Sequence, residues 1–533
     1  MGKFAIRDLL LAPELDAQEV AALLRPFGFQ DIKKADVNIQ HIAEDAEIRV
    51  LFAEILEECL RCFSETPSPD LALNHFERFS RAVFGKAAFI SYLVESPQTL
   101  WRLSQVFGNI PFFSEILIRN PEYLYWVFSP EVLERPKKRG ELSGELSSAL
   151  RLLKSKETQL DFLRIFKRKE ILRIGVRDLL GKTAVEETLA DLSDLADVLI
   201  QKAYWICDKE MRRKYGIAMG EGDSGKNRRI GFTVLAMGKL GGRELNFSSD
   251  VDLMYLYEQR SGQSSGGRGK DRIPNAVYFE KLSKEVTASL NATTEQGYVY
   301  RVDLRLRPEG QGGMIATPFE GYRRYYDTRG ETWERLSLVK VRAVAGDLRL
   351  GRRFLEMAEP FIYDKSFGKS GFIEVREIKE RIEQECSEKK QTQRDVKRGR
   401  GGIREIEFIV QSLQVAFGGK DRKIRVRGSM DVLKKLSRGP YLSAEEFQLL
   451  SASYLFFRDL ENKLQMVRDQ QTHLIPTDPD ELRATALRMD YTDFTRGSAS
   501  VQLMKDYRGH ADRVHAIFQR VFYEKPFLPQ DDV

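Results

Sequence analysis

Cysteine and histidine are scarce in this chain of 533 residues. Four cysteines are too few for a disulfide framework at this length. Cys59 and Cys62 form a C-x-x-C pair inside a helical pattern, and no second cysteine pair accompanies them. We interpret them as ordinary helix residues rather than a zinc or redox site. The five histidines show no metal spacing, and we expect His510 and His515 to lie on a solvated helix.

Long apolar runs and a strong excess of one charge are also missing. No run approaches the roughly 18 residues of a membrane span, and the N-terminus lacks the apolar core of a signal peptide. Ile6 stands where a myristoylation signal has Ser or Thr. The net charge is only +6, and no aromatic and basic stacking surface stands out. These absences favour a soluble cytoplasmic protein that binds neither membranes nor nucleic acid.

The content of the sequence indicates several packed domains. The length suggests about two to four domains, and 42% hydrophobic residues are enough for packed cores. Helical patterns such as "LNHFERFSRAVF" and "EEFQLLSASYLFFRDLENKLQMV" dominate both ends. We therefore expect a mostly helical α+β fold. Its predicted parts are a helical region at 1–220, a small mixed sheet at 221–345 and a helical bundle at 346–533.

In the middle region the hydrophobic pattern changes from one typical of helices to one typical of strands. Short apolar segments bounded by glycine and polar residues are typical of strands, and strict alternation is typical of a half-buried strand. On this basis we expect strands at 229–238, 251–259 and 297–308, a helix at 275–294, and loops at 220–227 and 261–272. A helix between two strands predicts a crossover connection.

Three aspartates stand at matching positions of these predicted strands. Side chains alternate faces along a strand, so Asp250 and Asp252 share one face, and Asp303 shares a face with the arginines that follow it. If the two strands are neighbours, the three carboxylates converge. Close carboxylates repel one another unless a cation neutralises them, and Mg²⁺ is typically bound by carboxylates together with substrate phosphates.

The segment before Asp250 has few side chains and one lysine. Its glycines allow the backbone to approach a phosphate closely, and basic or hydroxyl groups nearby could bind the oxygens. The candidate phosphate-binding residues are Gly238, Lys239, Gly241, Gly242, Ser248, Ser249, Arg305 and Arg307. Each feature taken singly also fits a solvated face or a simple turn. Their conjunction with the three aspartates predicts a nucleotidyl-transfer site.

The same residues resemble a known superfamily. Met237, Gly238 and the pair Asp250 and Asp252 are similar to the DNA polymerase beta-like nucleotidyltransferase pattern, from which Lys239 departs. The segment "GKLGGRELNFSSDVDLMYLY" closely resembles the glutamine synthetase adenylyltransferase/adenylyl-removing enzyme family. Further segments of that kind lie at 166–181, 301–313, 332–347, 399–411 and 460–476, so the resemblance covers about 85 to 525.

The resemblance implies a function and a set of partners. The family has two nucleotidyltransferase halves: one attaches AMP to a tyrosine of glutamine synthetase, and the other removes it by phosphorolysis. The motif occurs once here, and "ELNFSSD" resembles the removing half. The implied enzyme is a deadenylylase that uses Mg²⁺ or Mn²⁺ at Asp250, Asp252 and Asp303. Its implied substrates are phosphate and ADP or ATP, and its implied partners are glutamine synthetase and a PII-type nitrogen-signal protein.

Two alternatives stay open at this point. One is an adenylyltransferase that uses ATP, because the same carboxylates serve both directions. The other is a catalytically silent regulatory module that binds a PII-type protein, against which the intact aspartates argue.

Two further basic segments are weaker candidates for the site. Lys340 and Arg342 could reach the nucleotide phosphates, or they could form a basic helix face. Arg404 and Glu405 open a predicted helix whose N-terminus could bind an anion. Their alternative role is in salt bridges, which we slightly prefer.

Overall fold

The structure is a computed structural model that describes residues 4–222, 225–268, 271–389, 391–495 and 497–524. The chain divides into two compact units, each built from segments that are distant in sequence. The first unit contains 1–136, 168–188 and 460–506, and the second contains 137–167, 189–459 and 507–533. The predicted division at residues 220 and 345 stays a prediction.

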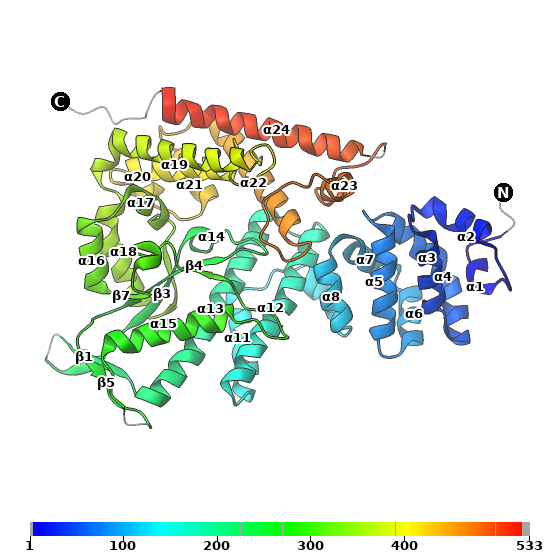
Figure 1. Ribbon diagram of the computed structural model, residues 1–533, viewed down its shortest axis with the longest axis horizontal. Coiled ribbons are helices and arrows are strands. Elements are labelled where there is room, and N and C mark those ends of the chain that lie inside the picture. Colours follow the sequence, from blue (N-terminus) through cyan, green and yellow to red (C-terminus); the bar gives the residue numbers. More distant parts are fainter. Residues whose placement is uncertain (1–3, 223–224, 269–270, 390, 496, 525–533) are drawn as a thin grey trace. The chain divides into compact units, whose positions relative to one another are not determined.

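The first unit consists of helices in its described part. Its helices are α1 (Asp8–Leu11), α2 (Ala17–Leu24), α3 (Ile32–Ile42), α4 (Ala46–Ser64), α5 (Pro69–Ala82), α6 (Lys86–Glu95), α7 (Pro97–Asn109), α8 (Pro111–Arg119), α9 (Tyr123–Val127), α10 (Pro130–Leu133) and α23 (Pro479–Arg488), with a 3₁₀ turn at Arg25–Phe27. Helices α3 to α7 pack side by side (Figure 1). Phe76 of α5 contacts Phe52 and Phe63 of α4 in their core.

Prolines mark the starts of several of these helices. Pro69, Pro97, Pro111 and Pro130 each occupy the first turn. Proline fits there because the first backbone N–H groups of a helix have no intrahelical partner. At α5 the hydroxyl of Ser68 also accepts a hydrogen bond from the N–H of Leu71 (3.3 Å). Each of these prolines therefore marks the start of a helix.

Four long helices contribute residues to both units: α12 (Lys156–Leu179), α13 (Val185–Tyr215), α22 (Ala444–Gln465) and α24 (Ser498–Gln519). The second unit adds α11 (Arg139–Leu152), α14 (Gly238–Gly241), α15 (Asn275–Asn291), α16 (Phe319–Thr328), α17 (Thr332–Leu338), α18 (Leu348–Ile362), α19 (Gly368–Glu388), α20 (Ile403–Gly418) and α21 (Ser429–Leu436). Shorter turns lie at Gly310–Gly312, Lys365–Phe367, Arg422–Ile424 and Arg520–Glu524. Its described residues also form two sheets.

The larger sheet has the order β6-β4-β3-β8, with β7 also paired to β4. Its strands are β3 (Phe232–Ala236), β4 (Val251–Tyr257), β6 (Val302–Asp303), β7 (Ala316–Pro318) and β8 (Arg342–Gly346). Strand β4 is antiparallel to β3 and parallel to β6 and β7. The sheet is therefore mixed, and α15 forms the crossover between β4 and β6 that the sequence predicts. The predicted fold class, mostly helical with a small mixed sheet, is confirmed.

Helices cover both faces of this sheet. On one face, Phe232 of β3 stacks on Tyr204 of α13 and on Phe279 of α15, with ring centroids 5.6 Å apart in each pair. On the other face, α18 packs so closely that a Cβ at Gly351 would lie 2.3 Å from the Cβ of Ala343. The sheet is thus held rigidly between helices, and its strand ends have fixed positions.

The sequence-based expectations for strands are only partly correct. Strands β3 and β4 lie inside the predicted segments, but the predicted strand at 297–308 contains only the two residues of β6. Beyond Asp303 the chain turns, because the guanidinium of Arg307 donates hydrogen bonds to loop carbonyls and Glu309 adopts a left-handed conformation with φ of 62°. The alternation in this segment therefore reflects a folded loop.

The predicted loops at 220–227 and 261–272 contain short strands. Strands β1 (Ala218–Glu221), β2 (Asn227–Arg229) and β5 (Gln263–Ser264) form the smaller sheet, in the order β2-β1-β5. These strands are too short to give a periodic signal. Residues 223–224 and 269–270 of the two predicted loops lie outside the described part of the chain.

The scarce residues also have defined surroundings. Cys59 and Cys62 are buried on α4, and burial raises the pKa of Cys62 to about 12, which favours a packing role. His510 and His515 lie on the partly exposed helix α24, as predicted, and both side chains are half-buried. The ring of His510 stacks 4.5 Å from that of Phe456, and His515 contacts Glu405.

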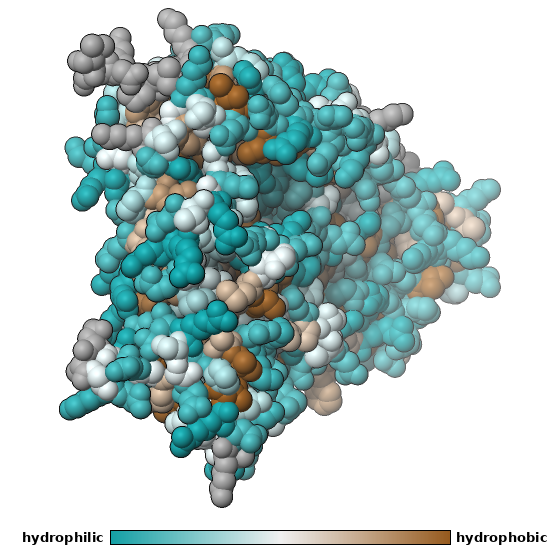
Figure 2. Space-filling model, turned by 60° about the vertical axis from the view of Figure 1, so that its left-hand side comes forward, coloured by the Kyte–Doolittle hydropathy of each residue, from teal (hydrophilic) through white to brown (hydrophobic). Residues whose placement is uncertain are grey.

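The surface in view in Figure 2 is mostly hydrophilic, and its apolar residues gather in small, separate patches. A membrane-spanning helix is not found in the described part of the chain, where none combines the required length with sufficient apolar character.

Candidate active site

Two of the three predicted aspartates lie directly opposite each other. Strands β4 and β6 run parallel, with Val251 next to Val302 and Asp252 next to Asp303. Neighbouring residues of paired strands point to the same face of a sheet. Val251 is buried, while Asp252 and Asp303 keep some exposure, so the carboxylates lie at the accessible edge of the core. The condition under which the carboxylates are expected to converge, that these two strands are neighbours, is therefore met.

The third aspartate, Asp250, immediately precedes β4 and is held by an arginine that sequence reasoning missed. The Nε of Arg301 donates a hydrogen bond to Oδ1 of Asp250 (2.7 Å), and its Nη2 donates to the carbonyl of Ser248 (2.6 Å). Arg301 is oriented in turn by the hydroxyl of Tyr298, which accepts from its Nη1 (2.8 Å). A guanidinium held at several points fixes the carboxylate that it contacts.

Asp252 is the carboxylate most affected by its surroundings. Burial, and then the negative charges of Asp303 and Asp250, raise the pKa of Asp252 to about 6. For Asp303, partial burial would raise the pKa, but hydrogen bonds from the side chain and backbone of Arg305 hold it below its ordinary value. The site therefore holds concentrated negative charge at neutral pH, which a cation would relieve.

Gly238 lies against this carboxylate patch. It begins α14 with φ of +52°, and a Cβ at this position would lie 2.3 Å from Oδ2 of Asp252. Glycine is required here both for the left-handed backbone and for the close approach. The short helix α14 contacts β4, so the glycine-containing segment and the aspartates form one site (Figure 1).

The other two glycines of this segment serve packing. A Cβ at Gly241 would lie 2.4 Å from the carbonyl oxygen of Lys340, and one at Gly242 would lie 2.8 Å from Oε2 of Glu244. Both glycines therefore admit the close contacts that hold the segment in place, and this geometry favours a structural role for them.

The remaining polar residues of the segment are tied together near the aspartates. The Nζ of Lys239 donates to Oδ1 of Asn246 (2.7 Å), which also accepts from the buried Arg458 of α22 (2.8 Å). Ser249 Oγ accepts from the backbone N–H of Asn246 (3.3 Å), and Ser248 Oγ contacts Arg301. Lys239, Ser248 and Ser249 thus lie in the predicted site, in an ordered loop.

The two arginines after Asp303 have different surroundings. Arg305 is exposed, and its Nε and Nη2 lie 2.8 Å and 2.5 Å from Oδ2 of Asp303. Arg307 is buried and donates to the carbonyls of Leu304 and Gly313. Arg305 can turn toward a ligand, whereas Arg307 shapes the loop. The predicted shared strand face is wrong, because β6 ends at Asp303.

Lys340 and Arg342 hold elements together. The buried Nζ of Lys340 lies 2.8 Å from Glu244 Oε2 and 3.3 Å from Glu407 Oε1. Arg342 forms a bidentate pair with Asp197 of α13, at 2.6 Å and 2.7 Å. Breaking a buried pair of this kind leaves an uncompensated charge. The interpretation of these residues as a basic helix face is wrong, and their geometry favours structural roles over contact with a nucleotide.

Arg404 and Glu405, adjacent at the start of α20, have separate environments. Arg404 lies close enough to Asp252 to lower its pKa, as does Lys397. Glu405 is buried, and its Oε1 lies 2.8 Å from the Nζ of Lys379. The salt-bridge role that the sequence favoured is confirmed for both residues, because Arg404 pairs with Oε2 of Glu407 at 3.8 Å. The charge of Arg404 also lies near Asp252.

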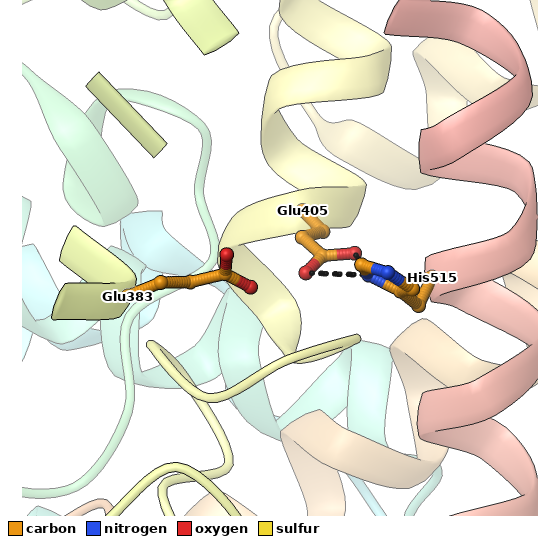
Figure 3. A group of neighbouring side chains, drawn as sticks. All are labelled: Glu383, Glu405 and His515. Carbon is orange, nitrogen blue, oxygen red and sulfur yellow. Dashed lines mark hydrogen bonds and ion pairs between the residues drawn. The ribbon is translucent and has the colours of Figure 1, made fainter. Parts of the chain in front are cut away.

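Glu405 belongs to a group with Glu383 of α19 and His515 of α24, whose ligand atoms lie within 4.8 Å of one another (Figure 3). Such a set could bind a metal ion, but Lys379 already pairs with both carboxylates. Burial would raise the pKa of Glu405, while hydrogen bonds with His515 and Lys379 hold it below its ordinary value. The ammonium group of Lys379 therefore supplies the cation that this cluster needs.

Sequence reasoning missed Arg301, Lys397 and Arg458 as parts of the site. A signal existed for Arg301, which directly precedes the strand that carries Asp303. Arg458 lies in a strongly apolar helical pattern, where a buried arginine requires a partner. Lys397 offered no signal, because its position near Asp252 arises from long-range packing.

Comparison with known proteins places the chain in a family. Residues 100–357 match the model of glutamate-ammonia ligase adenylyltransferase, and residues 376–522 match that of GlnD PII-uridylyltransferase. Several curated relatives are named bifunctional glutamine synthetase adenylyltransferase/adenylyl-removing enzyme. That of Thioalkalivibrio sulfidiphilus is 35% identical over 421 residues, which are 79% of this chain and 42% of the relative. That of Psychromonas ingrahamii is 34% identical over 453 residues, which are 85% and 46%.

A third relative, from Xanthomonas axonopodis pv. citri, carries the same name and is 39% identical over 333 residues, or 62% of this chain and 34% of the relative. The chain thus spans less than half the length of the curated relatives that it matches. With the carboxylates and the glycine-containing segment at one edge of a mixed sheet, these matches show that the chain belongs to the glutamine synthetase adenylyltransferase/adenylyl-removing enzyme family.

Proposed function

We propose that this chain removes AMP from an adenylylated tyrosine of glutamine synthetase by phosphorolysis. The observation that carries the proposal is the direct pairing of Asp252 with Asp303, beside an Asp250 that Arg301 fixes. An oxygen of orthophosphate attacks the α-phosphorus of the adenylyl group, and the bond from phosphorus to the tyrosine oxygen breaks. The products are ADP and unmodified tyrosine, whose oxygen receives a proton.

The donor set fits Mg²⁺ or Mn²⁺. Asp250, Asp252 and Asp303 provide carboxylate oxygens, which hard divalent cations prefer, and burial, followed by the negative charges of Asp303 and Asp250, raises the pKa of Asp252. The bound ion would neutralise this charge and polarise phosphate oxygens during in-line displacement. Asp303 suits the role of ligand better than that of proton donor, because Arg305 holds its pKa below the ordinary value.

The neighbouring residues would position the adenylyl phosphate. Gly238 leaves space beside Asp252 that any other residue would fill. Lys239, Ser248 and Ser249 lie in the ordered segment that leads to the aspartates, and we propose that they contact the nucleotide phosphate. Arg305 pairs with Asp303 here and would be released toward phosphate oxygens when a cation neutralises that carboxylate. Alignment and charge stabilisation supply most of the catalysis in such reactions.

The direction of the reaction is inferred from the lead-in "ELNFSSD", which resembles the removing half of the family. The alternative is adenylyl transfer from ATP, since the same carboxylates would serve it. Two incubations of the chain with Mg²⁺ separate the two directions. With adenylylated glutamine synthetase and phosphate, deadenylylation yields ADP. With unmodified glutamine synthetase and ATP, adenylyl transfer yields pyrophosphate. Formation of pyrophosphate without ADP would refute the proposed direction.

We further propose glutamine synthetase and a PII-type signal protein as partners. The names of the relatives support the first, and the match of residues 376–522 to a PII-uridylyltransferase model supports the second. A purely regulatory module that binds the PII-type protein is the non-catalytic alternative. It predicts that Asp252→Asn and Asp303→Asn leave every activity unchanged, whereas the proposed enzyme loses nucleotidyl transfer in both variants.

A further inference from the structure

A basic loop before α20 lies beside the three aspartates. The buried carboxylate of Asp395 accepts hydrogen bonds from the backbone N–H groups of Lys397 (3.0 Å) and Arg398 (2.8 Å). The N–H of Arg404 donates to the carbonyl of Lys397 (2.9 Å). These bonds fix the backbones of Lys397 and Arg404 next to each other, although the two residues are separated by a turn.

The turn between them is held equally firmly. Gly401 has φ of +71°, and a Cβ there would lie 1.9 Å from the carbonyl oxygen of Ala511 on α24. The N–H of Ile403 donates to the carbonyl of Val396 (3.0 Å). These contacts fix the backbone of the loop, so Lys397 and Arg404 have defined backbone positions.

Both charges lie near Asp252, and one donor of the Arg404 guanidinium has no hydrogen-bond partner in the described part of the chain, although the guanidinium lies 5.7 Å from the centre of the Phe408 ring. Each residue lies close enough to Asp252 for its charge to lower the pKa of that carboxyl. The Nη1 of Arg404 is 3.8 Å from Glu407 Oε2, too long for a hydrogen bond. Its Nε is buried and has no hydrogen-bond partner among the described residues. A buried donor of this kind requires an explanation, and a ligand oxygen provides one.

Glu407 alone does not satisfy the hydrogen-bond donors of Arg404. Its Oε1 lies 3.3 Å from the buried ammonium of Lys340, and the positive charges of Lys340, Arg404 and Lys397 together hold its pKa far below the ordinary value despite burial. Lys340, Arg404 and Lys397 thus supply positive charge around Glu407. A phosphate anion that approaches the aspartates needs positive charge nearby, because the carboxylates repel it.

We propose that Lys397 and Arg404 form an anion subsite for a tetrahedral phosphate group next to the three aspartates. This inference rests on the proposed function and deepens it. In phosphorolysis the subsite would hold the attacking orthophosphate, which becomes the β-phosphate of ADP. In transfer from ATP it would hold the β-phosphate of the nucleotide. The shared chemistry is a phosphate group adjoining the α-phosphorus.

The first test compares ADP with AMP, which differ by this phosphate. Binding of each nucleotide to the full chain is measured by calorimetry in the presence of Mg²⁺. Arg404→Gln and Lys397→Gln should each weaken ADP binding about 10-fold to 100-fold, the range expected for a lost charge-assisted hydrogen bond. AMP binding should stay unchanged, and Arg404→Lys should recover part of the loss because it restores the charge.

Arg400→Gln is the matched control, since it removes one positive charge from the same loop. Arg400 is exposed and pairs with Asp512 (3.5 Å), and we expect no change in either nucleotide. Thermal unfolding of all variants verifies that they fold. An unchanged preference for ADP over AMP in both subsite variants, or an equal loss in Arg400→Gln, would overturn the subsite.

The second arm identifies the source of the phosphate. Inorganic phosphate is titrated into the protein saturated with AMP and Mg²⁺. If Arg404→Gln weakens the binding of inorganic phosphate, the subsite is assigned to orthophosphate. If it weakens only the binding of ADP, the subsite is assigned to the β-phosphate of a nucleotide. Either result supports the subsite. Failure of the proposed function looks different: the wild-type chain would release no ADP from adenylylated glutamine synthetase, whatever its binding preferences.

Discussion

Replacing Asp252 with asparagine should make the metal-free protein more stable while abolishing its proposed activity. Burial and the charges of Asp303 and Asp250 raise the pKa of Asp252 from 3.8 to about 6. One pKa unit corresponds to 1.36 kcal/mol, so the ionised carboxylate costs the folded state about 3 kcal/mol. Asparagine has nearly the same shape and carries no charge, so it removes this cost.

The sign of the pH dependence follows from the raised pKa. Between about pH 4 and pH 6 the folded state binds the proton more tightly than the unfolded chain does. The cost of Asp252 is therefore absent below about pH 4 and complete above about pH 6. We expect Asp252→Asn to raise the free energy of unfolding by about 3 kcal/mol near pH 8, and by little near pH 4.

Unfolding by urea in the presence of EDTA is monitored by circular dichroism at both pH values. Asp327→Asn is the matched control, because Asp327 is exposed. Millimolar Mg²⁺ should then stabilise the wild type and leave Asp252→Asn unaffected. Destabilisation of Asp252→Asn near pH 8, or a gain that is equal at both pH values, would refute the reasoning that burial and the neighbouring carboxylates penalise the ionised form of Asp252.

Three other substitutions test the parts of the site. Arg305→Gln should tighten Mn²⁺ binding to the nucleotide-free protein several-fold, measured by electron paramagnetic resonance, because the guanidinium competes for Asp303; weaker binding would contradict this. Gly238→Ala should abolish ADP formation, since its Cβ would lie 2.3 Å from Asp252, and near-normal activity would show that the contact is dispensable. Arg301→Lys should lower kcat and change KM little, because a single ammonium group fixes Asp250 less firmly than the planar guanidinium does. A change in KM alone would indicate contact with the substrate instead.

The core of the site could be predicted because it depends on local rules. Alternation along a strand places Asp250 and Asp252 on one face, and a crossover helix between two apolar strands favours their parallel pairing. The structure adds the register, in which Asp252 pairs directly with Asp303. Gly238 was also predictable, because backbone that approaches a charged site closely tends to be glycine.

The roles of the basic residues could not be predicted in the same way. Lys340 and Arg307 carry the same charge as Arg404, yet the first two are buried among carboxylates or carbonyls and the third lies near Asp252. The surroundings of Lys340 depend on packing with an element more than 50 residues away, whereas Arg307 bonds to carbonyls of its own loop. The predicted strand at 297–308 failed for a related reason, since arginine side chains fold the segment into a loop after Asp303.

The most direct test of the central claim is an isotope experiment. The chain is incubated with adenylylated glutamine synthetase, Mg²⁺ and ¹⁸O-labelled phosphate, and the products are analysed by mass spectrometry. We predict loss of AMP from the tyrosine and ADP whose β-phosphate carries the label, and no reaction in Asp252→Asn. Release of unlabelled AMP, or labelled ADP at the same rate in Asp252→Asn, would contradict phosphorolysis at the three aspartates.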